Sequence, residues 1–352
     1  GLICTSITAE RARELELPPM ASSNTDPMKT AFTVSIDLAE GISTGISATD
    51  RAATIAALLS GSRKPADFSR PGHVFPLVAK RNGVLERPGH TEASVDLSTL
   101  AGLAPSGVIC EIANDDGTMS RLPQLIQFAR EHGLLLVTIR DLIAYRKRTE
   151  ILITKVGECA MPTRFGVFQA HAYWDELTGI EHIALVKDGP SNAEAIVRVH
   201  SECVTGEALG SLRCDCGEQL ERALAIIGAS VRGCLVYIRG HEGRGIGLAN
   251  KIRAYALQDD GYDTSEANRA LGLADDSRDY FAAAGILKDL AMHEVVLLTN
   301  SPAKMDALAS HGIAIARRRG LLVASSSVNQ AYLKTKADKY GHFLEVSRAL
   351  AG

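Results

Sequence analysis

The sequence lacks the features that mark several specialised classes of protein. No apolar run is as long as a membrane-spanning helix, and no basic segment followed by an apolar one opens the chain. The formal net charge is only -3, so there is no broad basic surface to hold a nucleic-acid backbone. We therefore expect a cytoplasmic protein with neither a membrane nor a nucleic acid as its partner.

Cysteines are few and irregularly spaced. The seven cysteines form no regular disulfide framework, and an odd number would leave one of them unpaired. Three of them, Cys203, Cys214 and Cys216, fall within fourteen residues. In a reducing compartment, such clustering indicates a metal site before it indicates a disulfide.

The composition is that of a globular protein with two domains. Hydrophobic residues make up 46% of the chain and charged residues 22%, which excludes a disordered protein. A length of 352 residues allows two domains, each with its own core. Because a break in the pattern falls near residues 145–165, we expect domains at 1–150 and 151–352.

Hydrophobic periodicity predicts alternating strands and helices. In the first half we expect strands at 32–36 and 73–77, a helix at 122–131 and a buried strand at 134–139. In the second half we expect strands at 195–200, 234–238 and 295–298, with helices at 220–227 and 248–257. The serine run at 325–327 predicts a loop. The fold class is therefore α/β and α+β, with a mixed sheet and flanking helices in each domain.

The cysteine cluster has the chemistry of a zinc site. Thiolates suit zinc, and structural zinc usually has four protein ligands. A site with only three leaves a position for water, whose pKa zinc lowers to about 7. His200 or Cys234 is a candidate fourth ligand for a structural site. Spacing alone therefore leaves the catalytic and the structural interpretation open.

A glycine-rich turn follows the strand expected at 234–238. It runs from residue 239 to 247, contains His241, Glu242 and Arg244, and precedes a helix. Backbone N–H groups at such a turn favour anions, although glycines can also serve only close packing. The mixed charges favour a binding site, and a carboxylate can accept hydrogen bonds from the N1–H and amino group of guanine.

Taken together, these segments of the second half resemble GTP cyclohydrolase II over most of residues 155–345. The resemblance is carried by the motifs His200-Ser201-Glu202-Cys203, Gly210-Ser211-Leu212-Arg213-Cys214-Asp215-Cys216-Gly217, Gln219-Leu220, Glu242-Gly243-Arg244, Lys251-Ile252-Arg253-Ala254-Tyr255, Asp276-Ser277-Arg278-Asp279, Thr299-Asn300 and Tyr332-Leu333-Lys334-Thr335-Lys336.

The resemblance implies roles for individual residues. The three cysteines would bind a catalytic zinc ion, Asp276 would accept a proton, and Arg278 falls at the position of the family's nucleophile. Because a guanidinium stays protonated, we interpret Arg278 instead as a clamp on the phosphates. The residues expected to contact GTP are Arg198, Val199, His200, Ser201, Glu202, Gln219, Glu242, Gly243, Arg244, Thr264, Thr299 and Lys304.

The resemblance also implies a reaction, the first step of riboflavin biosynthesis. GTP would be hydrolysed at C8 of guanine with zinc as the activating metal, which opens the imidazole ring. The products would be formate, pyrophosphate and 2,5-diamino-6-(5-phosphoribosylamino)pyrimidin-4(3H)-one, with Mg²⁺ neutralising the pyrophosphate. Tyr255 matches a family tyrosine near C8, and its presence favours complete removal of the formyl group.

The first half resembles 3,4-dihydroxy-2-butanone 4-phosphate synthase, which acts on ribulose 5-phosphate and releases formate. Its substrate and metal motif matches Arg87, Gly89, His90, Thr91 and Glu92, and its acid/base residue matches Glu111. His90 would bind Mg²⁺ or Mn²⁺, which stabilises a developing enediolate. Three further residues are expected near this pocket: Cys4, Thr44 and His73.

One departure from that family matters. Its Arg-Glu-x-Glu-Gly-Asp segment, which supplies a metal-binding glutamate, has no counterpart here, and we interpret the sequence as truncated at its N-terminus. The leading hypothesis is a bifunctional enzyme, expected to be a homodimer. The alternatives are a cyclohydrolase with an inert first domain, and a zinc-stabilised GTP-binding regulator without turnover.

Overall fold

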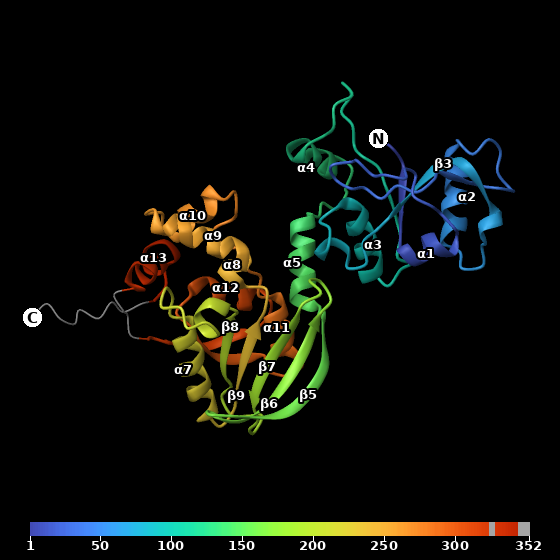
Figure 1. Cartoon of the computed structure of the whole chain (residues 1–352). Helices are drawn as coiled ribbons and strands as arrows, with labels where there is room; N and C mark the ends of the chain where they lie inside the picture. Colours follow the sequence, from blue (N-terminus) through green and yellow to red (C-terminus); the bar gives the residue numbers. More distant parts are fainter. Residues whose placement is uncertain (324–327, 344–352) are drawn as a thin grey trace, which may run out of the picture. The chain divides into compact units, whose positions relative to one another are not determined.

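The chain forms two compact units, residues 1–146 and 147–352 (Figure 1). The structure is a computed structural model that describes residues 1–323 and 328–343. Helix α5 (Ile139–Thr149) contains the boundary between the units, and the domain boundary expected at residue 150 follows its last residue. The serine run at 325–327, expected to be a loop, lies outside the described residues. No helix among the described residues is long and apolar enough to cross a membrane.

The first unit is built on a four-stranded mixed sheet. Its strand order is β2-β3-β1-β4, with β1 parallel to β3 and antiparallel to β4. The strands are β1 (Cys4–Ile7), β2 (Ile36–Leu38), β3 (Phe68–Val78) and β4 (Gly107–Ile109). The helices before α5 are α1 (Ala9–Glu14), α2 (Ala48–Leu59), α3 (His90–Leu100) and α4 (Leu122–Glu131), with short 3₁₀ turns at Pro65–Asp67 and Gly83–Leu85.

The core of the first unit joins this sheet to α1 and α2. Leu15, Ile36 and Leu58 are completely buried in it and come from segments far apart in the sequence. Helix α2 begins where the Ser47 hydroxyl accepts a hydrogen bond from the Asp50 amide, which satisfies one of the free N–H groups of the first turn.

The second unit is built on a seven-stranded mixed sheet with the order β11-β10-β8-β9-β7-β6-β5. The four strands from β11 to β9 are parallel, and β7, β6 and β5 continue the sheet as an antiparallel meander. The strands are β5 (Ile153–Thr163), β6 (Gly166–Asp175), β7 (Glu181–Lys187), β8 (Ile196–Ser201), β9 (Gly233–Ile238), β10 (Glu294–Leu298) and β11 (Ala314–Arg319). Both units thus confirm the expected mixed sheets.

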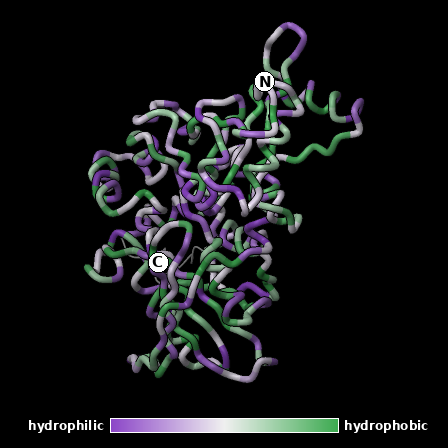
Figure 2. The backbone as a smooth tube through the Cα atoms, turned by 90° about the vertical axis from the view of Figure 1, so that its right-hand side faces the viewer, coloured by the Kyte–Doolittle hydropathy of each residue, from purple (hydrophilic) through white to green (hydrophobic). Residues whose placement is uncertain are grey.

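Helices cover the two faces of this sheet. Helices α11 and α12 pack on one face, and α7 packs on the other. The buried hydrophobic residues of this unit lie mainly on its strands and on α7, α11 and α12. Along the backbone, hydrophobic stretches alternate with hydrophilic ones (Figure 2). The helices are α6 (Val204–Glu207), α7 (Cys216–Gly228), α8 (Glu242–Gly245), α9 (Leu248–Asp259), α10 (Thr264–Ala270), α11 (Phe281–Asp289), α12 (Pro302–Ser310) and α13 (Gln330–Tyr340).

Two of the expected strands of the first unit are wrong or misplaced. Residues 134–138 form no strand, and α5 begins at Ile139, where the strand was to end. Leu135 is 96% exposed, and no strand pairs with this run among the described residues. A short apolar run does not become a strand without a hydrogen-bonding neighbour. The strand expected at 32–36 is reduced to isolated bridges at Phe32 and Thr33, and β2 begins only at Ile36.

Candidate active site

The alternation of β8 and β9 decides which side chains reach the site. Successive side chains of a strand point to opposite faces of the sheet. Val197 and Val199 therefore lie in the core beneath α11, whereas Arg198 and His200 emerge on the face of α7. The side chain of Val199, an expected GTP contact, is buried away from the cleft, and only its carbonyl takes part by accepting a hydrogen bond from Lys304 Nζ at 2.6 Å.

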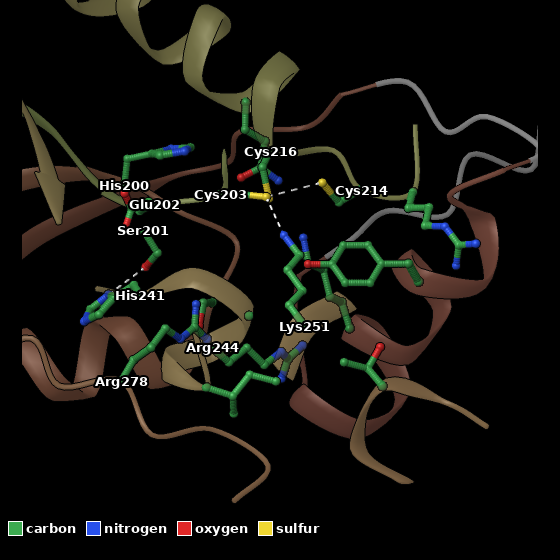
Figure 3. A pocket seen from close by; sticks show the side chains of 18 of the residues that line it. His200, Ser201, Glu202, Cys203, Cys214, Cys216, His241, Arg244, Lys251 and Arg278 are labelled. Carbon is green, nitrogen blue, oxygen red and sulfur yellow. Dashed lines mark hydrogen bonds between the residues drawn. The ribbon is translucent and has the colours of Figure 1, made fainter. Parts of the chain in front are cut away.

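The three clustered cysteines converge although they lie on different segments (Figure 3). Cys203 precedes α6, Cys214 lies in the following loop, and Cys216 opens α7. The Sγ atoms of Cys203 and Cys214 are 3.6 Å apart, far longer than a disulfide bond. Ligands about 2.3 Å from a tetrahedral zinc ion would lie roughly 3.8 Å from one another. The spacing therefore fits thiolate ligands of one zinc ion.

No fourth protein ligand among the described residues joins the cluster. Among residues 1–323 and 328–343, the three cysteines are the only group of three or more potential metal ligands whose donor atoms lie within 4.8 Å of one another. Cys234 is buried in the core on the opposite face of the sheet. His200 Nε2 is paired with Glu207 at 2.7 Å, and burial lowers the pKa of His200 to about 4. The donor set is thus that of a three-ligand site, which leaves a coordination position for water or substrate.

Gly206 makes the convergence of the cysteines possible. A Cβ atom at residue 206 would lie 2.6 Å from Cys214 Sγ and 3.3 Å from Cys203 Sγ. Carbon and sulfur atoms do not approach so closely without displacement. The sequence did not single out this glycine, because its role follows from three segments meeting around it.

A buried lysine contacts the cluster. Lys251 Nζ, on α9, lies 3.1 Å from Cys203 Sγ and 2.5 Å from Glu242 Oε1. Hydrogen bonds from the thiols of Cys214 and Cys216, together with the Lys251 charge, lower the pKa of Cys203. At least one sulfur is therefore held as a thiolate, the form that binds a metal.

The glycine-rich turn has an unusual backbone. Gly243 and Arg244 both have left-handed dihedrals, with φ of 60° and 66°. Such a conformation is rare for arginine and costs on the order of 1 kcal/mol or more. It buries the Glu242 carboxylate, which accepts hydrogen bonds from Lys251 and from the Val204 amide at 2.5 Å. Glu242 therefore serves the cysteine loop and does not line the cleft as a free acceptor for guanine.

The cleft beside the cysteines is rich in basic side chains. Its lining contains seven basic side chains and a single carboxylate, Glu202. Four of the seven are paired with carboxylates outside the lining, and burial lowers the pKa of Lys304 well below its ordinary value. Nε of Arg198 is buried and finds no hydrogen-bond partner among the described residues. A buried donor without a partner is costly unless a ligand satisfies it, and the cleft therefore suits a polyanion. The seven basic side chains of the lining are Arg198, Arg213, Arg244, Lys251, Arg278, Lys304 and Lys336.

Asp276 and Arg278 form a two-pronged ion pair. Arg278 Nε and Nη2 donate to the two carboxylate oxygens at 2.9 and 2.5 Å. Burial raises the pKa of Asp276, but the Arg278 guanidinium more than offsets this, so the pKa lies below its ordinary value. Arg278 lines the cleft, and it stays protonated because Tyr280 and Asp276 more than offset the effect of its burial on its pKa. The pairing favours an electrostatic role for Arg278.

The remaining predicted residues mostly reach the same cleft. Tyr255 projects toward the cysteine loop, and its hydroxyl lies 3.4 Å from Thr205 Oγ1. Gln219 uses both ends of its amide, accepting from Arg198 and donating to Asp215. The other predicted residues that line the cleft are His200, Ser201, Glu202, Gly243, Arg244, Thr264, Thr299 and Lys304.

Several lining residues were not among the predicted contacts. Helix α13 contributes Tyr332 and Lys336, and Lys336 Nζ donates to Asp215 Oδ1 at 2.6 Å between two of the cysteines. His241, which the glycine-rich turn had drawn attention to, accepts or donates at 3.1 Å to Ser201, and burial lowers its pKa to about 3. The only sequence signal for α13 was the Tyr332 to Lys336 motif.

In the first unit, two predicted residues hold each other. Arg87 Nη1 lies 2.6 Å from Glu92 Oε2, and Glu92 is only 1% exposed. A Cβ atom at Gly89 would collide with both side chains, which accounts for the glycine. Thr91 is also buried. This ion pair fixes the first turn of α3 and occupies the Glu92 carboxylate inside the protein.

Other predicted residues gather at one edge of the first sheet. The register sets Cys4 beside Phe75 and Ile109, so His73 and Glu111 extend past the same end of β1. Glu111 accepts from its own backbone amide and that of Leu2, and these two hydrogen bonds lower its pKa more than its partial burial raises it. His73 Nδ1 is paired with Asp37 at 2.6 Å, next to the loop of Thr44. His90 is exposed and no set of three metal ligands forms around it among the described residues.

Comparison with known proteins covers both units. The family of 3,4-dihydroxy-2-butanone 4-phosphate synthases matches residues 1–145, and that of GTP cyclohydrolase II matches residues 154–320. The chain is 52% identical over 351 residues to riboflavin biosynthesis protein RibBA of Salinispora arenicola, covering 99% of this chain and 84% of the relative. The corresponding Aquifex aeolicus protein is 54% identical over 345 residues, covering 97% and 85%.

A solved structure has the same architecture. The two-domain 3,4-dihydroxy-2-butanone 4-phosphate synthase RibBX of A. baumannii superposes with a TM-score of 0.61 at 34% identity, covering 92% of this chain and 85% of that one. Fold, family matches and relatives agree along the length of the chain. The chain belongs to the family of bifunctional riboflavin biosynthesis enzymes, in which a 3,4-dihydroxy-2-butanone 4-phosphate synthase domain precedes a GTP cyclohydrolase II domain.

Proposed function

We propose that the second domain hydrolyses GTP in a zinc-dependent reaction to formate, pyrophosphate and 2,5-diamino-6-(5-phosphoribosylamino)pyrimidin-4(3H)-one. The observation that carries this proposal is the three-cysteine cluster at the wall of a cleft lined by seven basic side chains, among them Arg198 with a buried Nε donor that has no partner among the described residues. Zinc held by Cys203, Cys214 and Cys216 supplies a Lewis acid that makes water reactive near neutral pH. A purely structural site would use a fourth protein ligand, and the cluster has none among the described residues.

The protein's own residues provide binding and charge stabilisation. Arg198 and Lys304 offer buried donors to the triphosphate, and Arg278 balances the charge that develops as pyrophosphate leaves, with Mg²⁺ as the counterion. We assign the proton acceptor to Asp276 on the resemblance to GTP cyclohydrolase II; its pKa is lowered by Arg278, so it would accept a proton when substrate binding draws Arg278 away. Tyr255 lies between the cysteine loop and the cleft, where its hydroxyl can orient the purine ring.

Metal analysis combined with a product assay tests this proposal. We expect one zinc ion per chain, lost in Cys214→Ser together with formate release from GTP. A GTP-binding regulator would bind GTP in both the wild type and Asp276→Asn, with formate from neither. That result would refute the proposed hydrolysis.

We propose that the first domain converts ribulose 5-phosphate to 3,4-dihydroxy-2-butanone 4-phosphate and formate, with Glu111 as acid/base and His90 beside it. The position of Glu111 and His73 past the same end of β1, beside Cys4, supports this assignment. Mg²⁺ or Mn²⁺ would be held by His90, around which the described residues offer no complete set of metal ligands. A formate assay with ribulose 5-phosphate tests the assignment. We expect the wild type to release formate and Glu111→Gln to release none; an inert first domain would release none in either protein.

We also propose that the enzyme is a homodimer. Exposed apolar side chains concentrate in the first unit, among them Leu103, Leu135 and Val137. Such a concentration is unusual for a monomer surface. Light scattering after size exclusion should give twice the mass of the chain, and a monomer mass would refute this.

A further inference from the structure

Lys251 is a buried cation whose surroundings point to the metal site. Its side chain is 11% exposed, and its ammonium group has three partners: Glu242 Oε1 at 2.5 Å, Thr205 Oγ1 at 2.7 Å and Cys203 Sγ at 3.1 Å (Figure 3). An ammonium has three N–H donors, and all three are used. Lys251 therefore has no N–H donor left to bind substrate.

The net charge of a zinc-loaded cluster explains why a cation lies against Cys203. Three thiolates around a divalent ion carry a net charge of minus one, in a site where Cys203 is only 5% exposed. A buried net charge is costly unless an opposite charge lies nearby. The Lys251 ammonium supplies that charge directly at the sulfur, and hydrogen bonds to thiolate ligands tune the metal they hold.

Glu242 holds the lysine in place. Its second oxygen accepts the Val204 amide next to Cys203, so the carboxylate joins the cysteine loop to α9. The carboxylate itself is buried by the left-handed turn at Gly243 and Arg244. The strained turn, the carboxylate, the lysine and the thiolate thus form one connected chain of contacts.

We propose that Lys251 is a positioning residue of the zinc site, which donates to the Cys203 thiolate and neutralises the three-thiolate cluster, with Glu242 as the residue that aims it. This inference rests on the proposed zinc site, because it concerns the ligand that holds the metal. It assigns Glu242 to the support of the metal instead of to guanine.

Zinc affinity and the spectrum of the cobalt-substituted protein test the role of Lys251. In Lys251→Met we expect zinc to bind 10- to 100-fold more weakly in chelator competition, the range typical of lost partners of metal ligands. The sulfur-to-cobalt charge-transfer band should shift, because the thiolate loses its donor. Arg253→Met, an exposed position on the same helix, is the matched control and should leave both readouts unchanged.

A double variant separates this role from a structural ion pair. Lys251→Met leaves the Glu242 carboxylate buried without its partner, which alone can destabilise the fold. Lys251→Met with Glu242→Met removes both charges. If the pair is only structural, the double variant regains wild-type zinc affinity and the wild-type cobalt band, and the inference is overturned. If Lys251 acts on the thiolate, the weaker affinity and the shifted band persist.

The two proposals fail in different ways. If the Cys214→Ser variant retains its zinc, the zinc site itself is misassigned. If zinc is lost in that variant but Lys251→Met matches the wild type in affinity and spectrum, only the role of Lys251 is wrong.

Discussion

Replacing Gly206 with alanine is the sharpest test of the cysteine cluster, because the change adds one methyl group and no charge. The glycine lies in α6 with an ordinary helical backbone, so alanine brings no strain of its own. The new Cβ atom would lie 2.6 Å from Cys214 Sγ, whereas non-bonded atoms of this size rest about 3.5–4 Å apart. One of the two atoms must move by roughly 1 Å.

A zinc site does not tolerate such a shift. Ligand distances vary by only about 0.2 Å, so a displaced Cys214 is lost as a ligand or held with strain. We expect zinc affinity to fall about 100-fold, which is roughly 2.7 kcal/mol, and formate release from GTP to fall with metal content. Chelator competition and metal analysis measure the first, and a formate assay at limiting zinc measures the second.

Gly157→Ala is the matched control. Gly157 lies in the same unit with an ordinary backbone, and a Cβ atom there meets nothing within 4 Å. It should therefore keep wild-type zinc content and activity. Wild-type zinc affinity in Gly206→Ala would refute the reasoning, since it would mean that the three sulfurs do not meet around residue 206.

Three further predictions concern other parts of the enzyme. Asp276→Asn should lower kcat for GTP by about 10²- to 10⁴-fold through loss of a proton acceptor, with zinc content unchanged; equal loss of zinc would contradict this. Lys336→Met leaves the Asp215 carboxylate, 1% exposed, without its ion-pair partner and should cost about 3–5 kcal/mol of unfolding free energy, seen in urea titration. Because the pair keeps the pKa of Asp215 below its ordinary value, its contribution to stability is present at neutral pH and is lost as pH falls through that lowered pKa. Glu111→Gln should abolish formate release from ribulose 5-phosphate while GTP hydrolysis continues; parallel loss of both activities would contradict separate sites.

Sequence patterns predicted the second unit better than the first. The strands at 196–201 and 233–238 lie within a residue of where they were expected. Both are short runs rich in aliphatic residues, and each pairs with a parallel strand in the sheet. The helix Leu122–Glu131 was also predicted correctly. The strand expected at 134–139 was wrong, since four consecutive apolar residues carry no information on whether a neighbouring strand exists.

The candidate site shows the same division. Residue types predicted the chemistry. Three clustered cysteines indicate zinc, and the resemblance to GTP cyclohydrolase II assigned the basic residues to GTP binding. Pairing within the fold decided which of them remain available. The buried carboxylates of Glu242 and Glu92 are both paired with cations, Lys251 and Arg87, so neither is a free acceptor.

What the sequence determined by itself is therefore the identity of the donors and the order of the two domains, because motif spacing and apolar periodicity are local properties. Only the tertiary structure decided that, among the described residues, no fourth potential ligand lies with the three cysteines, since Cys234 faces the opposite side of the sheet and His200 does not join the cluster. Contacts between segments distant in the sequence leave no local pattern. The support of Cys203 by Lys251 is such a contact, 48 residues apart in the chain.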